Sequence, residues 1–181
     1  MRILMLGNSF TSTNQLPERL AQRTGAEVAA HTRGGARLAE QLNPNTRLGA
    51  RTLAALRESH WDYVFLQEMS NGPITAPEKF RDSVRRLSQL LRAHGAEPVL
   101  YATWAYENPE RLSALGLTRE EMYQAMHRAC CAAAAENRLR MADVGTRFQL
   151  HADEGLFGPD GVHPNLRGTE LAVETLAAAL R

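Results

Sequence analysis

The stretch Ile3-Leu4-Met5-Leu6-Gly7-Asn8-Ser9-Phe10 decides the fold class, because it joins an apolar run directly to a tight turn. Four consecutive apolar residues are typical of a buried strand, and the Gly-Asn-Ser sequence favours a turn. A helical pattern follows over residues 15–24, with Leu16 and Leu20 on one face and Gly25 as the stop signal. The first 25 residues therefore predict a strand, a turn and a helix, the repeating unit of an α/β protein.

The same alternation continues along the rest of the chain. We predict strands near residues 26–31, 63–66, 98–102 and 139–144, and helices over 48–58, 78–94, 118–137 and beyond Pro164. This order implies an α/β fold with a central, mainly parallel sheet of about five strands and helices on both faces. The length suits a single domain over residues 1–181. In such sheets the loops after the carboxyl ends of the strands build the active site.

The composition argues against several classes of protein. Lysine and arginine number 21 against 20 acidic residues, so there is no electrostatic case for binding nucleic acid or an anionic membrane surface. No apolar run approaches the roughly 18 residues of a membrane span. Cys130 and Cys131 are adjacent, which makes a bridge between them implausible. The N-terminus lacks a signal-peptide pattern, so we expect a cytoplasmic protein.

Two short motifs could carry chemistry. Ser9 follows the first strand on a turn that could point its hydroxyl over the sheet edge, although Asn8 and Ser9 could also merely shape that turn. The second motif is Asp160-Gly161-Val162-His163-Pro164, in which Asp160 could accept the Nδ1–H of His163 and leave Nε2 free as a base. The other reading of this motif is an Asx-turn beside an incidental histidine.

Together the two motifs supply a nucleophile, a base and a residue that orients the base. The chain resembles the SGNH/GDSL hydrolase superfamily, with Gly7-Asn8-Ser9-Phe10 as its first block and Asp160-Gly161-Val162-His163-Pro164-Asn165 as its last. This resemblance implies a three-layer α/β/α sandwich of the flavodoxin-like kind. It also implies a serine esterase without cofactor or metal, with Ser9, Asp160 and His163 as its triad. Asn8 replaces the usual Asp, which should alter hydrogen bonding within the turn.

The resemblance also implies donors for an oxyanion hole. The N–H of Ser9 is one donor, and the glycine block Arg33-Gly34-Gly35-Ala36-Arg37 suggests Gly35 as another, with Gly34 as an alternative. The third block departs from the family pattern and reads Leu66-Gln67-Glu68-Met69-Ser70-Asn71-Gly72. Either Gln67 or Asn71 could supply a side-chain amide. We favour Gln67, because the Gln-Glu pair resembles acetylesterase-like members. Glu68 could be an anchor behind it or a solvent-exposed charge on the loop.

The resemblance favours short acyl esters, such as acetyl groups on carbohydrates, over lipid esters and thioesters. Trp104 and Tyr106 follow the fourth strand and could line the acyl or sugar pocket or simply pack within their loop. Residues 107–117 could form a lid. The expected partner is a small-molecule ester, possibly an acylated carbohydrate, and the sequence leaves the oligomeric state open.

Three alternative functions are compatible with parts of the sequence. A nucleotide- or phosphate-binding domain could use residues 7–13, but a P-loop lysine and the GxGxxG spacing are both missing. A non-catalytic relative of the same fold could bind nucleotide or carbohydrate, although an intact Ser9, Asp160 and His163 argue against it. Asp160 and His163 could instead bind a metal, but the sequence offers no third ligand nearby.

Overall fold

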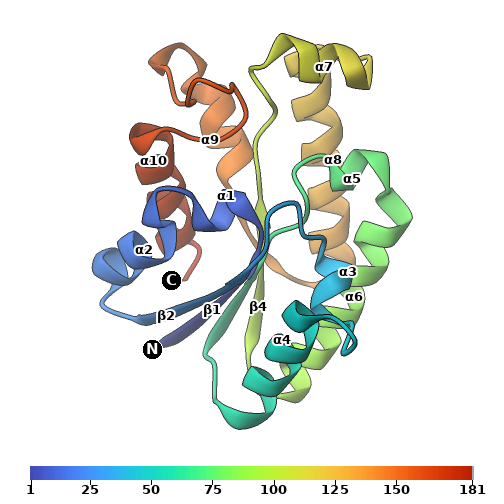
Figure 1. Cartoon of the computed structure of the whole chain (residues 1–181), viewed down its shortest axis with the longest axis vertical. Coiled ribbons are helices and arrows are strands. Elements are labelled where there is room, and N and C mark those ends of the chain that lie inside the picture. The colour runs from blue at the N-terminus through green and yellow to red at the C-terminus, as the bar shows by residue number, and fades with distance from the viewer. Residues whose placement is uncertain (181) are drawn as a thin grey trace.

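Five parallel strands form the central sheet of the computed structural model, which describes residues 1–180 (Figure 1). The strands are β1 (Arg2–Gly7), β2 (Glu27–Thr32), β3 (Tyr63–Leu66), β4 (Glu97–Ala102) and β5 (Arg140–Asp143). Their order in the sheet is β2-β1-β3-β4-β5. The chain therefore leaves β1 in one direction and returns to pair β3 on its other side. Such a reversal opens a crevice at the carboxyl ends of the two strands, where ligands bind in folds of this kind.

Helices cover both faces of the sheet. The helices are α1 (Ser9–Ser12), α2 (Leu16–Thr24), α3 (Leu38–Gln41), α4 (Arg47–Glu58), α5 (Gly72–Thr75), α6 (Pro77–Ala93), α7 (Pro109–Leu115), α8 (Arg119–Asn137), α9 (Val144–Leu150) and α10 (Leu166–Ala178). Figure 1 shows α2, α9 and α10 on one side and α4, α6 and α8 on the other. Within residues 1–180, no helix has both the length and the hydrophobicity that crossing a membrane requires.

The core is divided into two clusters because successive side chains of a strand point to opposite faces. In β1, Ile3 and Met5 pack in the cluster beneath α2 and α10, whereas Leu4 and Leu6 pack in the cluster beneath α4 and α6. All four side chains are at most 1% exposed. The unbroken apolar run that predicted β1 is thus the signature of a strand covered on both faces.

The long elements lie close to their predicted limits, because their ends carry local signals. Gly25 and Gly95 adopt left-handed conformations directly after α2 and the last turn of α6, with φ values of 67° and 76°. At the start of α8, the hydroxyl of Thr118 accepts from the Glu121 N–H, and the Glu121 carboxylate accepts from the Thr118 N–H. This is a capping box, and α8 ends at Asn137, as the predicted helix over residues 118–137 does.

The short helices were not predicted. The sequence shows no clear periodicity over residues 103–117 and 145–162, yet α7 and α9 form there, each with seven residues. Helices of this length complete barely two turns, so too few positions repeat on one face to create an apolar stripe. The sequence does carry capping signals for α7, because Asn108 caps its start and Gly116, with a φ of 66°, ends it.

Candidate active site

Ser9 is the first residue of α1, directly beyond the carboxyl end of β1. Asn8 caps this short helix, because its side-chain Oδ1 accepts a hydrogen bond from the Phe10 N–H at 3.0 Å. Asn8 and Phe10 are buried, whereas Ser9 is partly exposed and lines a cavity. The turn thus presents the serine hydroxyl at the crevice between β1 and β3.

The structure brings Ser9, His163 and Asp160 together from opposite ends of the chain. Ser9 Oγ lies 2.9 Å from His163 Nε2, and His163 Nδ1 lies 2.6 Å from Asp160 Oδ2. The other carboxylate oxygen of Asp160 accepts from the N–H groups of Val162 and His163 at 3.0 and 2.9 Å. The Asx-turn and the Asp–His pair, which the sequence offered as alternatives, therefore coexist in one loop.

The charge of Asp160 assigns the protons in this chain of hydrogen bonds. Burial raises the pKa of Asp160, but hydrogen bonds from the His163 ring and from the Val162 and His163 N–H groups outweigh that effect and lower the pKa to about 2. An ionised carboxylate can only accept, so the Nδ1 of His163 carries the proton that it donates. In the neutral ring, Nε2 is then free to accept from the Ser9 hydroxyl.

A cavity of about 500 Å³ opens beside Ser9. Its wall combines the carboxyl end of β1, the glycine loop after β2, the loop after β3, the segment between β4 and α7, and the Asp160–His163 loop. The lining residues are Asn8, Ser9, Phe10, Gly35, Met69, Ser70, Asn71, Tyr106, Asn108, Glu110, Arg111, Ala114, Leu115, Asp160, Val162 and His163. A volume of this size accommodates a small organic substrate.

The backbone N–H groups of Ser9 and Gly35 and the side-chain amide of Asn71 are donors in this cavity wall that have no acceptor among residues 1–180. Gly35 has a φ of 67°, a conformation that glycine adopts without strain. Unpaired donors beside a nucleophile are what a tetrahedral oxyanion requires. The arrangement can therefore support attack on a carbonyl carbon and binding of the resulting negative oxygen.

Comparison with known proteins places the chain in a family. The model of the GDSL-like lipase/acylhydrolase family matches residues 5–171. The chain belongs to this family. It is therefore an esterase-type hydrolase with the SGNH fold, as the resemblance in the two terminal motifs predicted. Among curated proteins, no match was found.

Solved structures resemble the acylhydrolase over its whole length. A protein of Slackia heliotrinireducens, described as a candidate SGNH hydrolase, is 47% identical, with a TM-score of 0.96 and coverage of 100% of this chain and 99% of that one. Axe2, an acetylxylan esterase from Geobacillus stearothermophilus, is 16% identical, with a TM-score of 0.71 and coverage of 99% and 93%. The acetyl xylan esterase AlAXEase is 13% identical, with a TM-score of 0.75 and full coverage of both chains. The last two likenesses show a shared fold.

Of the two candidate amides in the acylhydrolase, the structure brings Asn71 to the cavity but not Gln67. Gln67 is 1% exposed, and its Oε1 accepts from the Asn8 N–H and the Thr11 hydroxyl, both at 2.9 Å. Its amide nitrogen donates to the carbonyl of Glu68, and the side chain does not line the cavity. The preference for Gln67 thus has no support in this geometry. The sequence places Gln67 at the end of a strand, but this position alone does not predict whether the side chain points into the crevice or into the protein beneath it.

Glu68 lies behind the cavity wall, as the anchor reading expected. Its carboxylate accepts from the N–H groups of Met69 at 2.8 Å and Leu38 at 3.2 Å, and a guanidinium nitrogen of Arg37 lies 4.0 Å away. Burial raises the pKa of the Glu68 carboxyl, and these backbone bonds and the Arg37 charge oppose the rise. A Cβ on Gly72 would approach Glu68 Cγ to 2.7 Å, so glycine is needed where the loop passes this side chain.

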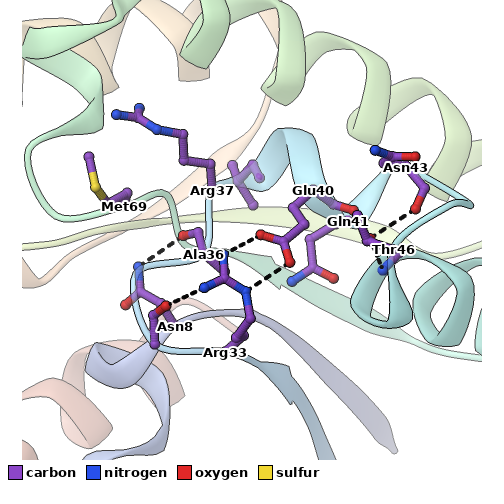
Figure 2. A network of polar contacts seen from close by, with 12 residues as sticks. Asn8, Arg33, Ala36, Arg37, Glu40, Gln41, Asn43, Thr46 and Met69 are labelled. Carbon is purple, nitrogen blue, oxygen red and sulfur yellow. Dashed lines mark hydrogen bonds and ion pairs between the residues drawn. The ribbon is translucent and has the colours of Figure 1, made fainter.

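Asn8 joins the nucleophile turn to the glycine loop. Its side-chain nitrogen donates to the carbonyl of Ala36 at 3.2 Å and lies 3.5 Å from the carbonyl of Glu68. Figure 2 shows the Asn8 side chain pointing toward Ala36, and beside it the ion pair of Arg33 and Glu40 that closes the loop, with Nε and Oε1 2.9 Å apart. These contacts need a donor, which the Asp more usual in the family would lack when ionised.

We expect Asn8→Asp to destabilise the acylhydrolase by about 2–4 kcal/mol at neutral pH, because a buried carboxylate would face two carbonyl oxygens. The new carboxyl should have a raised pKa, so its protonated form, which donates again, should recover stability as the pH falls. Thermal unfolding at several pH values measures this. Asn45→Asp, the same change at an exposed position without side-chain hydrogen bonds, is the control. A loss equal to that of Asn45→Asp would contradict the prediction.

The two aromatic residues expected at the pocket lie in different places. Tyr106 lines the cavity, and its hydroxyl contacts the Ser70 hydroxyl from the neighbouring loop. Trp104 is fully buried and does not line the cavity; instead its indole nitrogen donates to the carbonyl of Val162 at 2.9 Å. The structure therefore corrects the expectation for Trp104. Residues two positions apart share a face in a regular strand, but the chain has no regular secondary structure over residues 103–108. Trp104 and Tyr106 can therefore point in different directions.

The segment 107–117, expected as a lid, contributes α7 to the cavity wall. Asn108, Arg111 and Leu115 of this segment are among the lining residues, together with Glu110 and Ala114. The N-cap Asn108 was the readable signal for this helix, because its Oδ1 accepts from the Arg111 N–H at 2.9 Å. Sequence reasoning missed that α7 supplies so much of the site.

Proposed function

We propose that the protein cleaves carboxylic esters through an acyl-enzyme, with Ser9 as nucleophile, His163 as base and Asp160 as the residue that orients the base. The observation that supports this most directly is the chain of hydrogen bonds from Ser9 Oγ through the His163 ring to Asp160, with distances of 2.9 and 2.6 Å. Both distances fall within the reach needed for proton transfer.

In the first half-reaction, Ser9 Oγ attacks the ester carbonyl carbon as its proton passes to His163 Nε2. The N–H groups of Ser9 and Gly35 and the Asn71 amide bind the tetrahedral oxyanion. The carbon–oxygen bond to the alcohol then breaks, and His163 returns its proton to that oxygen. In the second half-reaction, His163 takes a proton from water, and the water oxygen attacks the acyl carbon. The bond from this carbon to Ser9 Oγ then breaks, His163 returns the proton to Oγ, and the carboxylic acid leaves.

We propose short acyl esters of carbohydrates, acetyl esters above all, as the substrates. The cavity wall includes the hydroxyls of Ser70 and Tyr106 and the amides of Asn71 and Asn108, groups that suit a hydroxyl-rich alcohol better than an alkyl chain. Axe2 and AlAXEase, which share the fold, carry the description acetylxylan esterase. Lipid esters and thioesters are the alternatives of the same chemistry.

A fluorophosphonate probe followed by peptide mass spectrometry tests the proposed nucleophile. We expect one phosphonyl adduct, located on Ser9, because among the cavity-lining residues within 1–180 only this hydroxyl is hydrogen-bonded to an imidazole nitrogen. An unlabelled Ser9 in folded protein would favour a non-catalytic binding protein of the same fold. Stabilisation by nucleotides in a thermal shift assay would favour the phosphate-binding alternative.

An ester panel tests the substrate class. Acetylated xylooligosaccharide and p-nitrophenyl acetate should be hydrolysed with higher kcat/KM than p-nitrophenyl palmitate and an acyl-CoA thioester. A preference for the palmitate would support the lipid alternative instead. Within residues 1–180, no group of three His, Cys, Asp or Glu side chains lies close enough together to bind a metal ion.

A further inference from the structure

Residues 160–163, which carry two of the three proposed triad members, lie on an irregular and exposed loop. The side chains of Asp160 and His163 are 52% and 35% exposed. The backbone contacts of the loop with itself are few: the Gly158 N–H donates to the His163 carbonyl at 2.9 Å, and the Gly161 N–H to the Gly158 carbonyl at 3.0 Å. A loop with so little packing needs outside contacts if the imidazole is to stay within reach of Ser9.

Those contacts come from one segment, the chain between β4 and α7. Three successive carbonyls of the loop accept hydrogen bonds from it. The Asp160 carbonyl accepts from the Asn108 side chain at 2.9 Å, and the Gly161 carbonyl accepts from the N–H groups of Glu107 and Asn108 at 2.8 and 3.0 Å. The Val162 carbonyl accepts from the Trp104 indole at 2.9 Å. The backbone of residues 160–162 is therefore held against the segment between β4 and α7 by a hydrogen bond at every carbonyl.

The approach of the two backbones depends on Gly161. This residue has a φ of 61°, and a Cβ on it would lie 2.8 Å from the Asn108 nitrogen. A side chain at this position would therefore be strained and would also separate the loop from its donors. Glycine at position 161 therefore allows the loop to pack closely against the backbone of residues 107–108.

Trp104 is fixed in place on both faces of its ring. It stacks on Phe10 with ring centroids 4.6 Å apart and on Phe148 with centroids 4.3 Å apart. The edge of Phe10 in turn meets the His163 ring, with centroids 5.3 Å apart and planes at 82°. Trp104 is fully buried, so its N–H donor has a single direction and a single acceptor.

On the other side of the histidine, Asn14 gives a further contact. Its side chain donates to the Pro164 carbonyl and to the Thr169 hydroxyl, both at 2.9 Å. Asn14 has a φ of 54°, a conformation that is uncommon for residues other than glycine. The segment that carries Ser9 and the loop that carries His163 are therefore joined directly as well.

We propose that Trp104 and Asn108 are positioning residues, which act through the carbonyls of Val162 and Asp160 to keep His163 aligned between Asp160 and Ser9. The proposal rests on the proposed function of these three residues. Asn108 also caps α7, so the same side chain links the alignment of the triad to the helix that lines the substrate cavity.

The test compares Trp104→Phe with Trp61→Phe. Both changes remove an indole donor from a buried tryptophan and keep an aromatic ring. Trp61 is 5% exposed and donates to the Ala55 carbonyl at 3.1 Å, but it precedes β3 and so lies at the end of the sheet opposite the cavity. We expect Trp104→Phe to lower kcat on p-nitrophenyl acetate about tenfold with little change in KM, and Trp61→Phe to leave both constants unchanged.

A second variant removes the other contact. Asn108→Ser retains an oxygen that can cap α7 but is too short to donate to the Asp160 carbonyl, and it should lower kcat by a similar factor. Equal losses of kcat in Trp104→Phe and Trp61→Phe would show a general effect of destabilisation and overturn the proposal. So would a wild-type kcat in both Trp104→Phe and Asn108→Ser.

Proton NMR gives a readout that is independent of any substrate. The His163 Nδ1–H bonded to Asp160 should give a low-field resonance in wild type and Trp61→Phe, and this resonance should weaken or shift in Trp104→Phe. Unchanged resonances in all variants would overturn the proposal. If wild type neither hydrolyses esters nor reacts with the fluorophosphonate, the proposed function fails, whereas the NMR comparison still decides whether Trp104 aligns His163.

Discussion

Replacement of Ser9 by alanine is expected to lower kcat for p-nitrophenyl acetate by about 10⁴-fold or more while the protein stays folded. The hydroxyl has one side-chain partner, His163 Nε2 at 2.9 Å, and Ser9 is partly exposed at the cavity. Its removal therefore deletes the nucleophile but no packing of the core. Steady-state kinetics with circular dichroism and thermal unfolding measures both effects.

Ser12→Ala is the matched control for this experiment. Ser12 lies on the same short helix, is exposed, and its side chain makes no capping hydrogen bond. We expect the wild-type rate from this variant and the same unfolding temperature within experimental error. A near-wild-type rate in Ser9→Ala would refute the assignment of the nucleophile, and the fluorophosphonate label would then have to lie elsewhere.

Asp160→Asn is expected to lower kcat by about 10⁴-fold through the tautomer of His163. The amide oxygen can still accept from the Val162 and His163 N–H groups, so the loop keeps its turn. The amide nitrogen, however, would meet Nδ1 as a donor and would favour the ring with its proton on Nε2. That ring can no longer accept from Ser9. Kinetics at neutral pH tests the size of the loss, and retention of more than a tenth of the wild-type kcat would contradict it.

The same variant tests the pKa of Asp160. The pKa of this carboxyl is lowered from 3.8 to about 2 in the folded protein. A lowered pKa contributes stability that is present above the unfolded value and is lost as the pH falls through the folded one. The difference in unfolding temperature between wild type and Asp160→Asn should therefore narrow between about pH 4 and pH 2. A constant difference over this window would show that the carboxylate is not stabilised in this way.

A loss of activity at a pH above this window would have a different origin. Because Asp160 stays ionised down to about pH 2, its protonation would not remove activity in the mildly acid range. An imidazolium at His163 would, since it has no lone pair to accept the Ser9 proton.

Much of the fold was readable because its signals are local. The apolar run Ile3–Leu6, the glycines at 25 and 95 and the capping box at Thr118 each act within a few residues, and the strand and helices that they delimit lie close to their predicted ranges. The short helices α7 and α9 were missed, because seven residues cannot display a repeating apolar face.

The site was only partly readable from the sequence. The motifs around Ser9 and His163 correctly predicted which residues come together. A serine after the first strand is typical of a nucleophile, and an Asp-x-x-His loop is typical of a base with its orienting carboxylate. Gln67, Asn71 and Trp104 could not be placed in the same way. Whether their polar atoms reach the cavity depends on the direction of each side chain from its loop, and here Gln67 and Trp104 point into the protein while Asn71 lines the cavity.

By itself, the sequence determined the order of the strands and long helices, the parallel sheet and the pair of terminal motifs, since propensity, caps and turns depend on near neighbours in the chain. Only the tertiary structure decided that the carbonyls of residues 160–162 accept from residues 104–108 and that Gln67 lies beneath the Ser9 turn. These contacts join residues 52 to 59 positions apart in the chain, and no local pattern encodes them. They arise when the sheet brings the carboxyl ends of β1, β3 and β4 to one edge.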